Sequence, residues 1–278
     1  MIINFKRFVL TIIILLNTSI SFAMTNNEQH ITSTLPNKID TFWKSGIFSS
    51  FTGIDSVRIN YAQFTTHPHA ECIVISPGRV EGYIKYQELA FELSQQHYNV
   101  FIIDHRGQGF SQRMATNAHK GHVVTFDDYA HDLATFVNQH VLEHCNTGNK
   151  PILLAHSMGG AIATRVLQLY PNLIKAAVLS SPMFSINSGG IPLWLAQALI
   201  NTGAFFNNLL SNEPWYFFGQ GNYNPSRFSE NRLTHSKKRY QGFIDSYQQQ
   251  AKVQLGGVTF QWLKQALQVN RDIFKNIN

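Results

Sequence analysis

The fold is decided by the stretch Pro151-Ile-Leu-Leu-Ala-His-Ser-Met-Gly-Gly160, which continues into Ala161-Ile-Ala-Thr-Arg-Val-Leu-Gln-Leu-Tyr170. An apolar run typical of a strand breaks at Ser157 and passes into a run with helical spacing. A serine at the apex of a sharp strand-to-helix turn is typical of a nucleophile elbow. Such a strained turn needs small residues two positions before and after the serine, where this chain has Ala155 and Gly159. The alternative is a glycine-containing turn in which Ser157 is incidental.

The composition indicates a globular protein with a sizeable core. The chain has 278 residues, of which 44% are hydrophobic. Length alone favours two domains, but large α/β folds often form a single domain, so we predict one domain with an insertion. The formal net charge is +6, and +4 remains once Lys6 and Arg7 are set aside. The main basic run, Lys237-Lys-Arg239, is more typical of a solvated helix face, so we expect no nucleic-acid partner.

The N-terminus has the pattern of a signal peptide over residues 1–23. Lys6 and Arg7 precede the apolar run Phe8-Val-Leu-Thr-Ile-Ile-Ile-Leu-Leu16, and Ser21 and Ala23 occupy small-residue positions before a cleavage point. The apolar run is shorter than the roughly 20 residues of a comfortable membrane span. We therefore expect an exported protein, periplasmic or secreted, with an N-terminal lead at 24–46. An uncleaved membrane anchor is the alternative.

The chain has two cysteines, Cys72 and Cys145. In an exported protein they raise the question of a disulfide. Both are expected near the N-terminal ends of neighbouring strands, so a bridge is feasible, and a buried Cys72 that acts as a small hydrophobic residue is equally compatible with the sequence. The 12 histidines are scattered, and no Cys/His spacing suggests a metal site. We expect no metal and no cofactor.

Apolar runs alternate with amphipathic segments along the first two thirds of the chain. This alternation predicts an α/β fold with a mostly parallel, doubly wound sheet covered on both faces. In such sheets the chemistry gathers at the carboxyl ends of the strands, where Ser157, Pro77-Gly-Arg79 and Asp104-His-Arg-Gly107 all fall. The expected strands lie within 49–66, 71–76, 99–104, 151–156 and 174–181, and the expected helices at 86–98, 126–142, 158–170 and 260–269.

Three motifs in this order resemble one branch of the α/β-hydrolases. They are Ser76-Pro-Gly-Arg-Val-Glu-Gly-Tyr83, Ile103-Asp-His-Arg-Gly-Gln-Gly-Phe-Ser111 and Leu154-Ala-His-Ser-Met-Gly-Gly160. Together they are similar to the lysophospholipase L2 and monoacylglycerol lipase branch, which has a serine aminopeptidase S33-type domain, and Asn231-Arg-Leu-Thr-His-Ser236 resembles the lysophospholipase L2 group. The likeness runs from about 48 to 267. It implies an α/β-hydrolase fold and a lysophospholipid or monoacylglycerol substrate.

The resemblance also implies roles for individual residues. Ser157 would attack the ester carbonyl, and the backbone N–H groups of Met158 and Arg79 would form the oxyanion hole. For Pro77-Gly78 the alternative is a plain turn. His156 lies next to the serine and faces the other side of the strand, so we interpret it as structural.

The tight loop that follows the strand at 99–104 also contributes to the site. We expect Asp104 and Arg106 to brace the site through hydrogen bonds rather than to bind phosphate, because a lone Gly-x-Gly is a weak phosphate signal.

The stretch 184–257 breaks the α/β rhythm and corresponds to a lid insertion in the resembling family. We predict a core at 47–183 and a return to it at 258–278. Large apolar side chains in the insertion are candidates for the walls of an acyl pocket and for peripheral membrane contact. The alternative is ordinary packing of the lid against the core. The candidates are Trp194, Phe205, Phe206, Trp215 and Phe217.

The acid and the base of a catalytic triad are the difficulty. In this fold they follow the serine in the order Ser, Asp or Glu, His. After Ser157 the only histidine is His235, inside the lid, and no histidine follows Asp245. The resembling family continues with strands that carry both residues, so we expect a chain truncated at its C-terminus that lacks them. His235 is disfavoured as a substitute base.

Three hypotheses follow from this pattern. The first is a lipid esterase whose chain is truncated and whose activity is doubtful, because a serine without a base is a poor nucleophile. The second is a catalytically inactive lipid-binding protein. The third is a non-lipid esterase or peptidase of the same fold.

Overall fold

The computed structural model describes residues 35–146, 148–231 and 233–276. The predicted signal peptide, 1–23, and residues 24–34 of the predicted lead therefore lie outside the described residues. The chain divides into a unit that ends at Ser45 and a unit that begins at Gly46. In the first unit, helix α2 (Leu35–Lys44) carries an ion pair between Lys44 and Asp40 at 2.6 Å. All that follows concerns the second unit.

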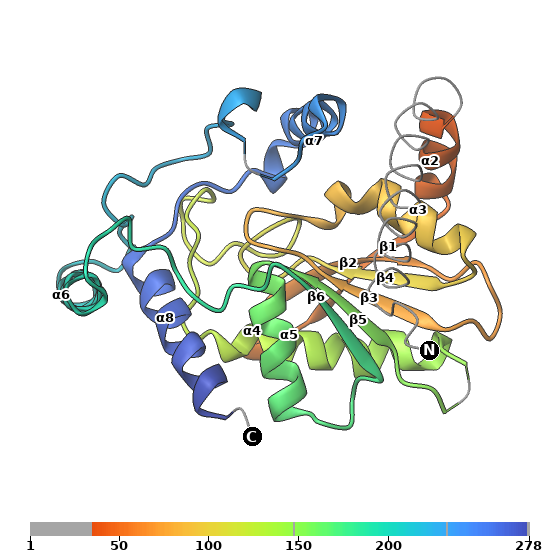
Figure 1. Cartoon of the computed structure of the whole chain (residues 1–278), viewed down its shortest axis with the longest axis horizontal. Helices are drawn as coiled ribbons and strands as arrows, with labels where there is room; N and C mark the ends of the chain where they lie inside the picture. The colour runs from red at the N-terminus through yellow and green to blue at the C-terminus, as the bar shows by residue number, and fades with distance from the viewer. Residues whose placement is uncertain (1–34, 147, 232, 277–278) are drawn as a thin grey trace, which may run out of the picture. The chain divides into compact units, whose positions relative to one another are not determined.

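A six-stranded sheet with the order β1-β2-β4-β3-β5-β6 forms the centre of the second unit (Figure 1). The first two strands run antiparallel to their neighbours, and the pairs β4–β3, β3–β5 and β5–β6 are parallel. This confirms the predicted mostly parallel α/β sheet. The strands are β1 (Ile47–Thr52), β2 (Arg58–Phe64), β3 (Cys72–Ser76), β4 (Asn99–Ile103), β5 (Ile152–His156) and β6 (Ala176–Ser180).

Helices cover both faces of the sheet. Helix α3 (Gln87–Gln95) lies on one face, and α4 (Asp127–Phe136) and α5 (Met158–Leu169) pack together on the other (Figure 1). The predicted helix over 126–142 is shorter as a regular α-helix, because α4 passes at Val137 into a wider π turn and then a 3-10 turn. The π turn keeps both Val137 and Val141 fully buried in the core.

The insertion contributes α6 (Leu193–Leu210) and α7 (Lys237–Gln249), and α8 (Phe260–Lys275) follows it. Helix α8 packs against both α5 and α6. The side chain of Thr259 caps α8 by accepting a hydrogen bond from the backbone N–H of Trp262 at 3.2 Å. The domain boundaries at 183 and 257 stay predictions.

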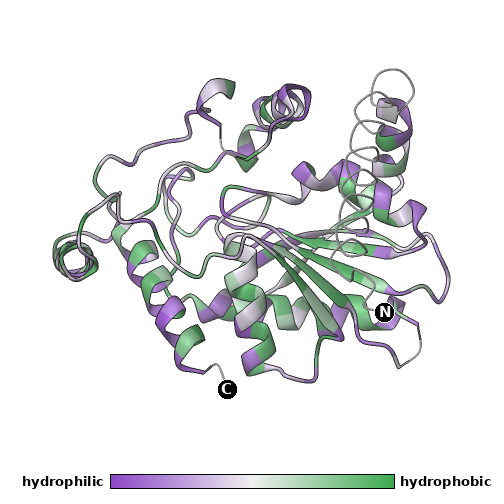
Figure 2. Ribbon diagram, in the orientation of Figure 1, coloured by the Kyte–Doolittle hydropathy of each residue, from purple (hydrophilic) through white to green (hydrophobic). Residues whose placement is uncertain are grey.

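The central strands are apolar on both faces (Figure 2). Val74, Phe101 and Leu153 of three neighbouring strands are fully buried. Strand β6 lies within the predicted 174–181, but the sheet is less covered there than the expected two-sided covering, since Val178 is 55% exposed. The physical reason is its position, because β6 ends the described strand order and has a neighbouring strand on one side only.

A disulfide joins Cys72, the first residue of β3, to Cys145, and their Cα atoms are 5.4 Å apart. This resolves the alternative that the sequence left open, because both cysteines are bridged. The bond ties the start of a central strand to the segment that leaves the π turn. Closing a loop of this length stabilises a fold mainly by restricting the unfolded chain.

Candidate active site

Ser157 lies at the turn between β5 and α5 in a strained conformation. Its backbone has φ 52° and ψ −117°, although it is not a glycine. Two backbone hydrogen bonds hold the turn: the N–H of Ser157 donates to the carbonyl of Ser180 at 3.0 Å, and the N–H of Gly160 donates to the carbonyl of Ser157 at 2.9 Å. Strain of this kind persists only where its surroundings enforce it, and it is typical of functional sites. The local geometry is that of a nucleophile elbow.

The residues two positions before and after Ser157 are small because the backbone of the neighbouring strand passes close to them. A Cβ atom at Gly159 would lie 2.1 Å from the carbonyl oxygen of Ser76 and 2.6 Å from that of Pro77. Backbone oxygens cannot give way to that extent, so only glycine fits. Ala155 stands beside Ser76 in the register of β5 and β3 and is buried, so its methyl group is accommodated where the usual pattern has a second glycine.

The predicted oxyanion donors, the backbone N–H groups of Met158 and Arg79, lie on α5 and on the loop after β3. Met158 is the first residue of α5, where the helix dipole presents its positive end. Arg79 lies on the loop after β3, and the clash distances at Gly159 place the start of that loop against the elbow. Within the described residues, no backbone or side-chain acceptor receives a hydrogen bond from the N–H of Arg79. The neighbouring N–H of Gly78 is occupied, because it donates to the carboxylate of Glu81 at 2.7 Å.

His156 is anchored away from the serine. Its Nδ1 atom lies 3.1 Å from Oε2 of Glu81, a buried carboxylate that also accepts hydrogen bonds from Lys85 and from the Tyr86 hydroxyl. Burial alone would raise the pKa of Glu81, but the hydrogen bond with His156 and the charge of Lys85 lower it to about 2. His156 therefore pairs with a carboxylate that stays ionised at neutral pH.

No general base contacts Ser157 in the part of the chain that the structure describes. There, Oγ of Ser157 forms no hydrogen bond with an imidazole or a carboxylate. His235 is exposed and lies on the segment that leads into α7. Among the described residues, the strained Ser157 at the elbow therefore has no imidazole or carboxylate in hydrogen-bond contact with its hydroxyl.

Asp104 and Arg106 brace the loop after β4, as expected. Asp104 is fully buried and accepts hydrogen bonds from the N–H groups of Tyr83 at 2.5 Å and Phe110 at 2.7 Å. Burial is the main cause that raises the pKa of Asp104 to about 7. At Gly109, φ is +55° and a Cβ atom would lie 2.1 Å from Oδ2 of Asp104. Gly109 therefore lets the backbone of this loop pass close to the buried carboxylate of Asp104. This structural role explains the glycine without a bound phosphate.

His105 is a site residue that the sequence analysis missed. It is fully buried, and its Nε2 atom lies 2.9 Å from Oγ of Ser76. Oγ of Ser76 also lies 3.3 Å from the carbonyl oxygen of Gly159, to which it can donate, and the donor in its contact with His105 depends on the tautomer of the imidazole. Burial lowers the pKa of His105 to about 3, so the ring is neutral at physiological pH. No sequence signal distinguishes this histidine, since its partner stands 29 residues earlier in the chain.

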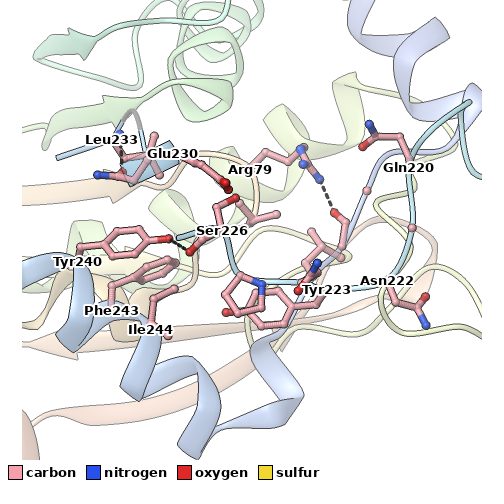
Figure 3. Close-up of a pocket in the computed structure, with 18 of the residues that line it drawn as sticks. Arg79, Gln220, Asn222, Tyr223, Ser226, Glu230, Leu233, Tyr240, Phe243 and Ile244 are labelled. Atoms are coloured by element: carbon pink, nitrogen blue, oxygen red, sulfur yellow. Dashed lines mark hydrogen bonds between the residues drawn. The ribbon is translucent and has the colours of Figure 1, made fainter. Parts of the chain in front are cut away.

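A cavity of about 540 Å³ begins at Arg79 (Figure 3) and is called the polar cavity after the polar side chains among its otherwise mixed lining. Its other walls come from the insertion and from the segment just before α8. The guanidinium of Arg79 donates to the carbonyl of Gly256 at 2.8 Å. The lining includes Gln220, Asn222, Tyr223, Glu230, Asn231 and Tyr240.

A second, apolar cavity of about 690 Å³ is lined mainly by the segment that follows β6, by α6 and by α8. The N–H of Met183 donates to the carbonyl of Ser157 at 2.9 Å, and the next residue, Phe184, lines this cavity. Apolar side chains of α6 and α8 form much of the remaining wall. They include Leu193, Leu199, Ile200, Leu263, Leu267 and Phe274.

The predicted acyl-pocket residues differ in whether they line the apolar cavity. Phe217 lines the apolar cavity, whereas Trp194, Phe205, Phe206 and Trp215 do not. Trp194 is 72% exposed, and Phe205 and Phe206 are exposed as well. Their predicted place in an acyl pocket stays a prediction; Trp194, Phe205 and Phe206 lie on α6, and Trp215 follows that helix. Hydropathy alone could not tell the two faces of this apolar helix apart.

Within the described ranges, no group of three or more His, Cys, Asp or Glu side chains could hold a metal ion. The same ranges contain no helix with both the length and the hydropathy needed to cross a bilayer.

Comparisons with known proteins place the chain in a family. The family model described as "Serine aminopeptidase, S33" matches residues 67–278. Lysophospholipase L2 of Escherichia coli K12 is 37% identical over 226 residues, which cover 81% of this chain and 65% of the relative. Monoacylglycerol lipase of Mycolicibacterium smegmatis is 30% identical over 153 residues, which cover 54% of this chain and 52% of the relative. Both relatives are named as carboxylic ester hydrolases, and the chain spans less than two thirds of the length of each.

Solved structures of low sequence identity share the fold. A soluble variant of monoglyceride lipase from Saccharomyces cerevisiae, crystallised with a substrate analog, has a TM-score of 0.61 at 20% identity, with 84% of this chain and 70% of that chain covered. The monoacylglycerol lipase of Paleococcus ferrophilus has a TM-score of 0.55 at 16% identity, with 83% and 72% covered. At these identities the likeness supports the architecture alone.

Proposed function

The chain belongs to the serine aminopeptidase S33 family of the α/β-hydrolases, and from this premise we propose that it cleaves carboxylic esters of lipids through an acyl-enzyme at Ser157. Lysophospholipids and monoacylglycerols are the proposed substrate class, in line with the names of its relatives. The observation that carries the proposal is the strained backbone of Ser157. Its carbonyl accepts a hydrogen bond from the N–H of Met183, and the residue after Met183, Phe184, lines the apolar cavity.

The proposed reaction proceeds in two steps. Oγ of Ser157 forms a bond to the ester carbonyl carbon and loses its proton to a base that no described residue in contact with it supplies and that added imidazole can replace, while the N–H groups of Met158 and Arg79 stabilise the negative oxygen. The tetrahedral intermediate then expels the glycerol oxygen, which takes up a proton, and leaves the acyl group on Ser157. Water attacks this acyl-enzyme in the same way and releases the fatty acid. The apolar cavity would hold the acyl chain throughout.

A second candidate function is lipid binding without turnover. The observation that favours it is that, among the described residues, no imidazole is in contact with Oγ of Ser157. A serine without a base keeps the cavities and the oxyanion hole but loses most of its reactivity. The two candidates differ in whether the site becomes active once a base is provided.

We expect imidazole added to the purified chain to restore part of its ester hydrolysis. A small base that diffuses into the site can take the Ser157 proton, provided that nucleophile and oxyanion hole are already in place. The substrates to compare are 1-lauroyl-lysophosphatidylcholine, 1-monolauroylglycerol and an aminoacyl p-nitroanilide, each assayed by product release against imidazole concentration. Imidazole-dependent cleavage of the two lipids alone supports the proposal. Cleavage of the anilide alone would favour a peptidase, and no protein-dependent cleavage would leave the lipid-binding candidate.

We also propose that the exposed face of α6 rests on lipid surfaces. Eight large apolar side chains of this one helix are exposed to solvent, and such a patch is typical of an interaction surface. They are Leu193, Trp194, Leu195, Leu199, Phe205, Phe206, Leu209 and Leu210.

The combined change Trp194→Ser, Phe205→Ser and Leu209→Ser is expected to reduce binding to lipid vesicles by about tenfold or more, since each buried apolar side chain contributes on the order of 1–3 kcal/mol. Co-flotation with phosphatidylethanolamine–phosphatidylglycerol vesicles measures this binding. Val124→Ser removes an exposed apolar side chain outside the insertion and serves as the control. Equal flotation of the triple variant and the unaltered chain would contradict the proposal.

We further propose export to an oxidising compartment, the periplasm or the cell exterior. The disulfide between Cys72 and Cys145 supports this, because such bonds persist where thiols are not kept reduced. Mass spectrometry of the chain recovered from cell fractions tests it. A reduced, cytosolic chain that retains its first 23 residues would contradict export.

A further inference from the structure

We infer that the side chain of Arg79 binds the phosphate of a lysophospholipid headgroup in the polar cavity, so that the site selects phosphodiester lipids over uncharged monoacylglycerols. This inference rests on the proposed function and narrows its substrate class. It follows from three observations, which concern the charge of Arg79, its position beside the elbow and the arrangement of the two cavities.

No carboxylate of the described residues forms an ion pair with Arg79. Among the described residues, its recorded polar side-chain contact is the bond to the carbonyl of Gly256 at 2.8 Å, and its guanidinium lies over the ring of Trp262, 5.8 Å from the centroid. By contrast, Arg106 and Arg165 form ion pairs with aspartates. Burial is the main cause that lowers the pKa of Arg79 to about 10. It is therefore a cation at neutral pH that has given up part of its hydration without an anion to replace it.

Arg79 also stands next to the reacting centre. The preceding residue, Gly78, faces His156, because a Cβ atom there would lie 3.0 Å from its Nδ1 atom. The backbone N–H of Arg79 is the proposed oxyanion donor, while its side chain points into the polar cavity (Figure 3). One residue thus connects the place where the ester carbonyl would sit with the place where the rest of the headgroup would extend.

The two cavities share a wall. Gln220 lines both, and the consecutive residues Gly257 and Val258 line the polar and the apolar cavity respectively. A lysophospholipid has the same division, with an apolar chain on one side of the ester and a phosphodiester on the other. Its phosphate would accept charge-assisted hydrogen bonds from the guanidinium. A monoacylglycerol would leave that charge without an anion.

The remaining walls of the polar cavity suit a headgroup that also carries a positive charge. Glu230 lies on an exposed part of the wall, and the aromatic side chains of Tyr240 and Phe243 line the same cavity. A carboxylate and aromatic rings are groups that attract an ammonium ion. A zwitterionic phosphodiester therefore fits the cavity better than a bare anion, which Glu230 would repel.

Binding of two detergents with the same alkyl chain tests the inference without any need for turnover. Dodecylphosphocholine carries the phosphodiester and the ammonium, dodecyl maltoside is uncharged, and neither contains an ester. We expect the full chain to bind dodecylphosphocholine about tenfold more tightly than dodecyl maltoside, both kept below their micelle concentrations and measured by isothermal titration calorimetry. A tenfold ratio is the size expected of one charge-assisted contact that is partly exposed to water.

Two variants of Arg79 separate its charge from its structural contact. Arg79→Met removes both the charge and the bond to Gly256, whereas Arg79→Gln removes the charge and keeps a donor for that carbonyl. Both are expected to abolish the preference for dodecylphosphocholine, with circular dichroism confirming the fold. The matched control is Lys175→Met, which removes a cation at the amino-terminal end of β6, where Lys175 pairs with Glu71. Its preference is expected to equal that of the unaltered chain.

Two outcomes overturn the inference, and they are distinguishable from failure of the proposed function. Equal binding of both detergents to the unaltered chain, or a preference that survives in Arg79→Gln, contradicts a phosphate contact while leaving the lipid site intact. Failure of the chain to bind either detergent contradicts the lipid-binding cavities themselves.

Discussion

Ser157→Ala is expected to lower imidazole-dependent hydrolysis of lauroyl esters by about two orders of magnitude or more, down to the rate of imidazole without protein. Removal of the hydroxyl eliminates the acyl-enzyme route altogether, and a single preorganised oxyanion donor is already worth on the order of 100-fold. The turn is expected to keep its backbone conformation in this variant. The hydrogen bonds that residue 157 forms with Ser180 and Gly160 use its main-chain atoms and not its side chain.

A fluorophosphonate probe provides a second measurement for the same change. We expect imidazole-accelerated labelling at Ser157 in the unaltered chain and none in Ser157→Ala. The matched control is Ser181→Ala, because Ser181 is an exposed serine at the carboxyl end of the neighbouring strand and also has a positive φ, 45°. Labelling that persists in Ser157→Ala and disappears in Ser181→Ala would identify Ser181 as the nucleophile and contradict the role proposed for Ser157.

Arg106→Met is expected to lower the free energy of unfolding by about 3–5 kcal/mol, which is a large part of the stability of an ordinary domain. The guanidinium is buried and donates to both carboxylate oxygens of Asp132, at 2.7 and 2.9 Å, and to Asp128 at 3.1 Å. It also donates to the carbonyl of Ile54 at 3.1 Å. Methionine fills a similar volume but leaves the buried Asp132 carboxylate without its counter-charge.

A double variant separates the loss of the pair from the loss of the side chain. Arg106→Met combined with Asp132→Leu removes the charges of this pair, and we expect it to be more stable than Arg106→Met alone, because the fully buried carboxylate of Asp132 is no longer left without a counter-charge, whereas Asp128 loses its partner in both variants. The N–H of Ile54, which donates to Asp132 at 2.9 Å, keeps the double variant below the unaltered chain. Urea unfolding followed by circular dichroism measures all three. A double variant as unstable as the single one would show that the charges are not the cause.

Much of the fold could be predicted from the sequence because its signals are local. The apolar runs at 71–76, 99–104 and 151–156 became the neighbouring parallel strands β3, β4 and β5. Helical spacing likewise located α5 and α8, although α8 continues to Lys275, beyond the predicted end at 269.

The elements that were predicted less well depend on their neighbours. Strand β6 has an apolar sequence and an exposed surface, because a strand is buried only where other elements cover it. Trp194, Phe205 and Phe206 belong to an apolar helix whose orientation decides which side chains line the cavity. Single-sequence hydropathy contains no information about that orientation.

The sequence by itself determined the α/β fold and the place of Ser157, because strand periodicity and the Ser-x-Gly turn operate over a few residues. Only the tertiary structure decided which polar groups meet. The guanidinium of Arg79 reaches the carbonyl of Gly256, 177 residues later, and Arg106 meets Asp132 across 26 residues. Pairings over such distances depend on where the whole chain places its loops and helices, and no local pattern of residues encodes them.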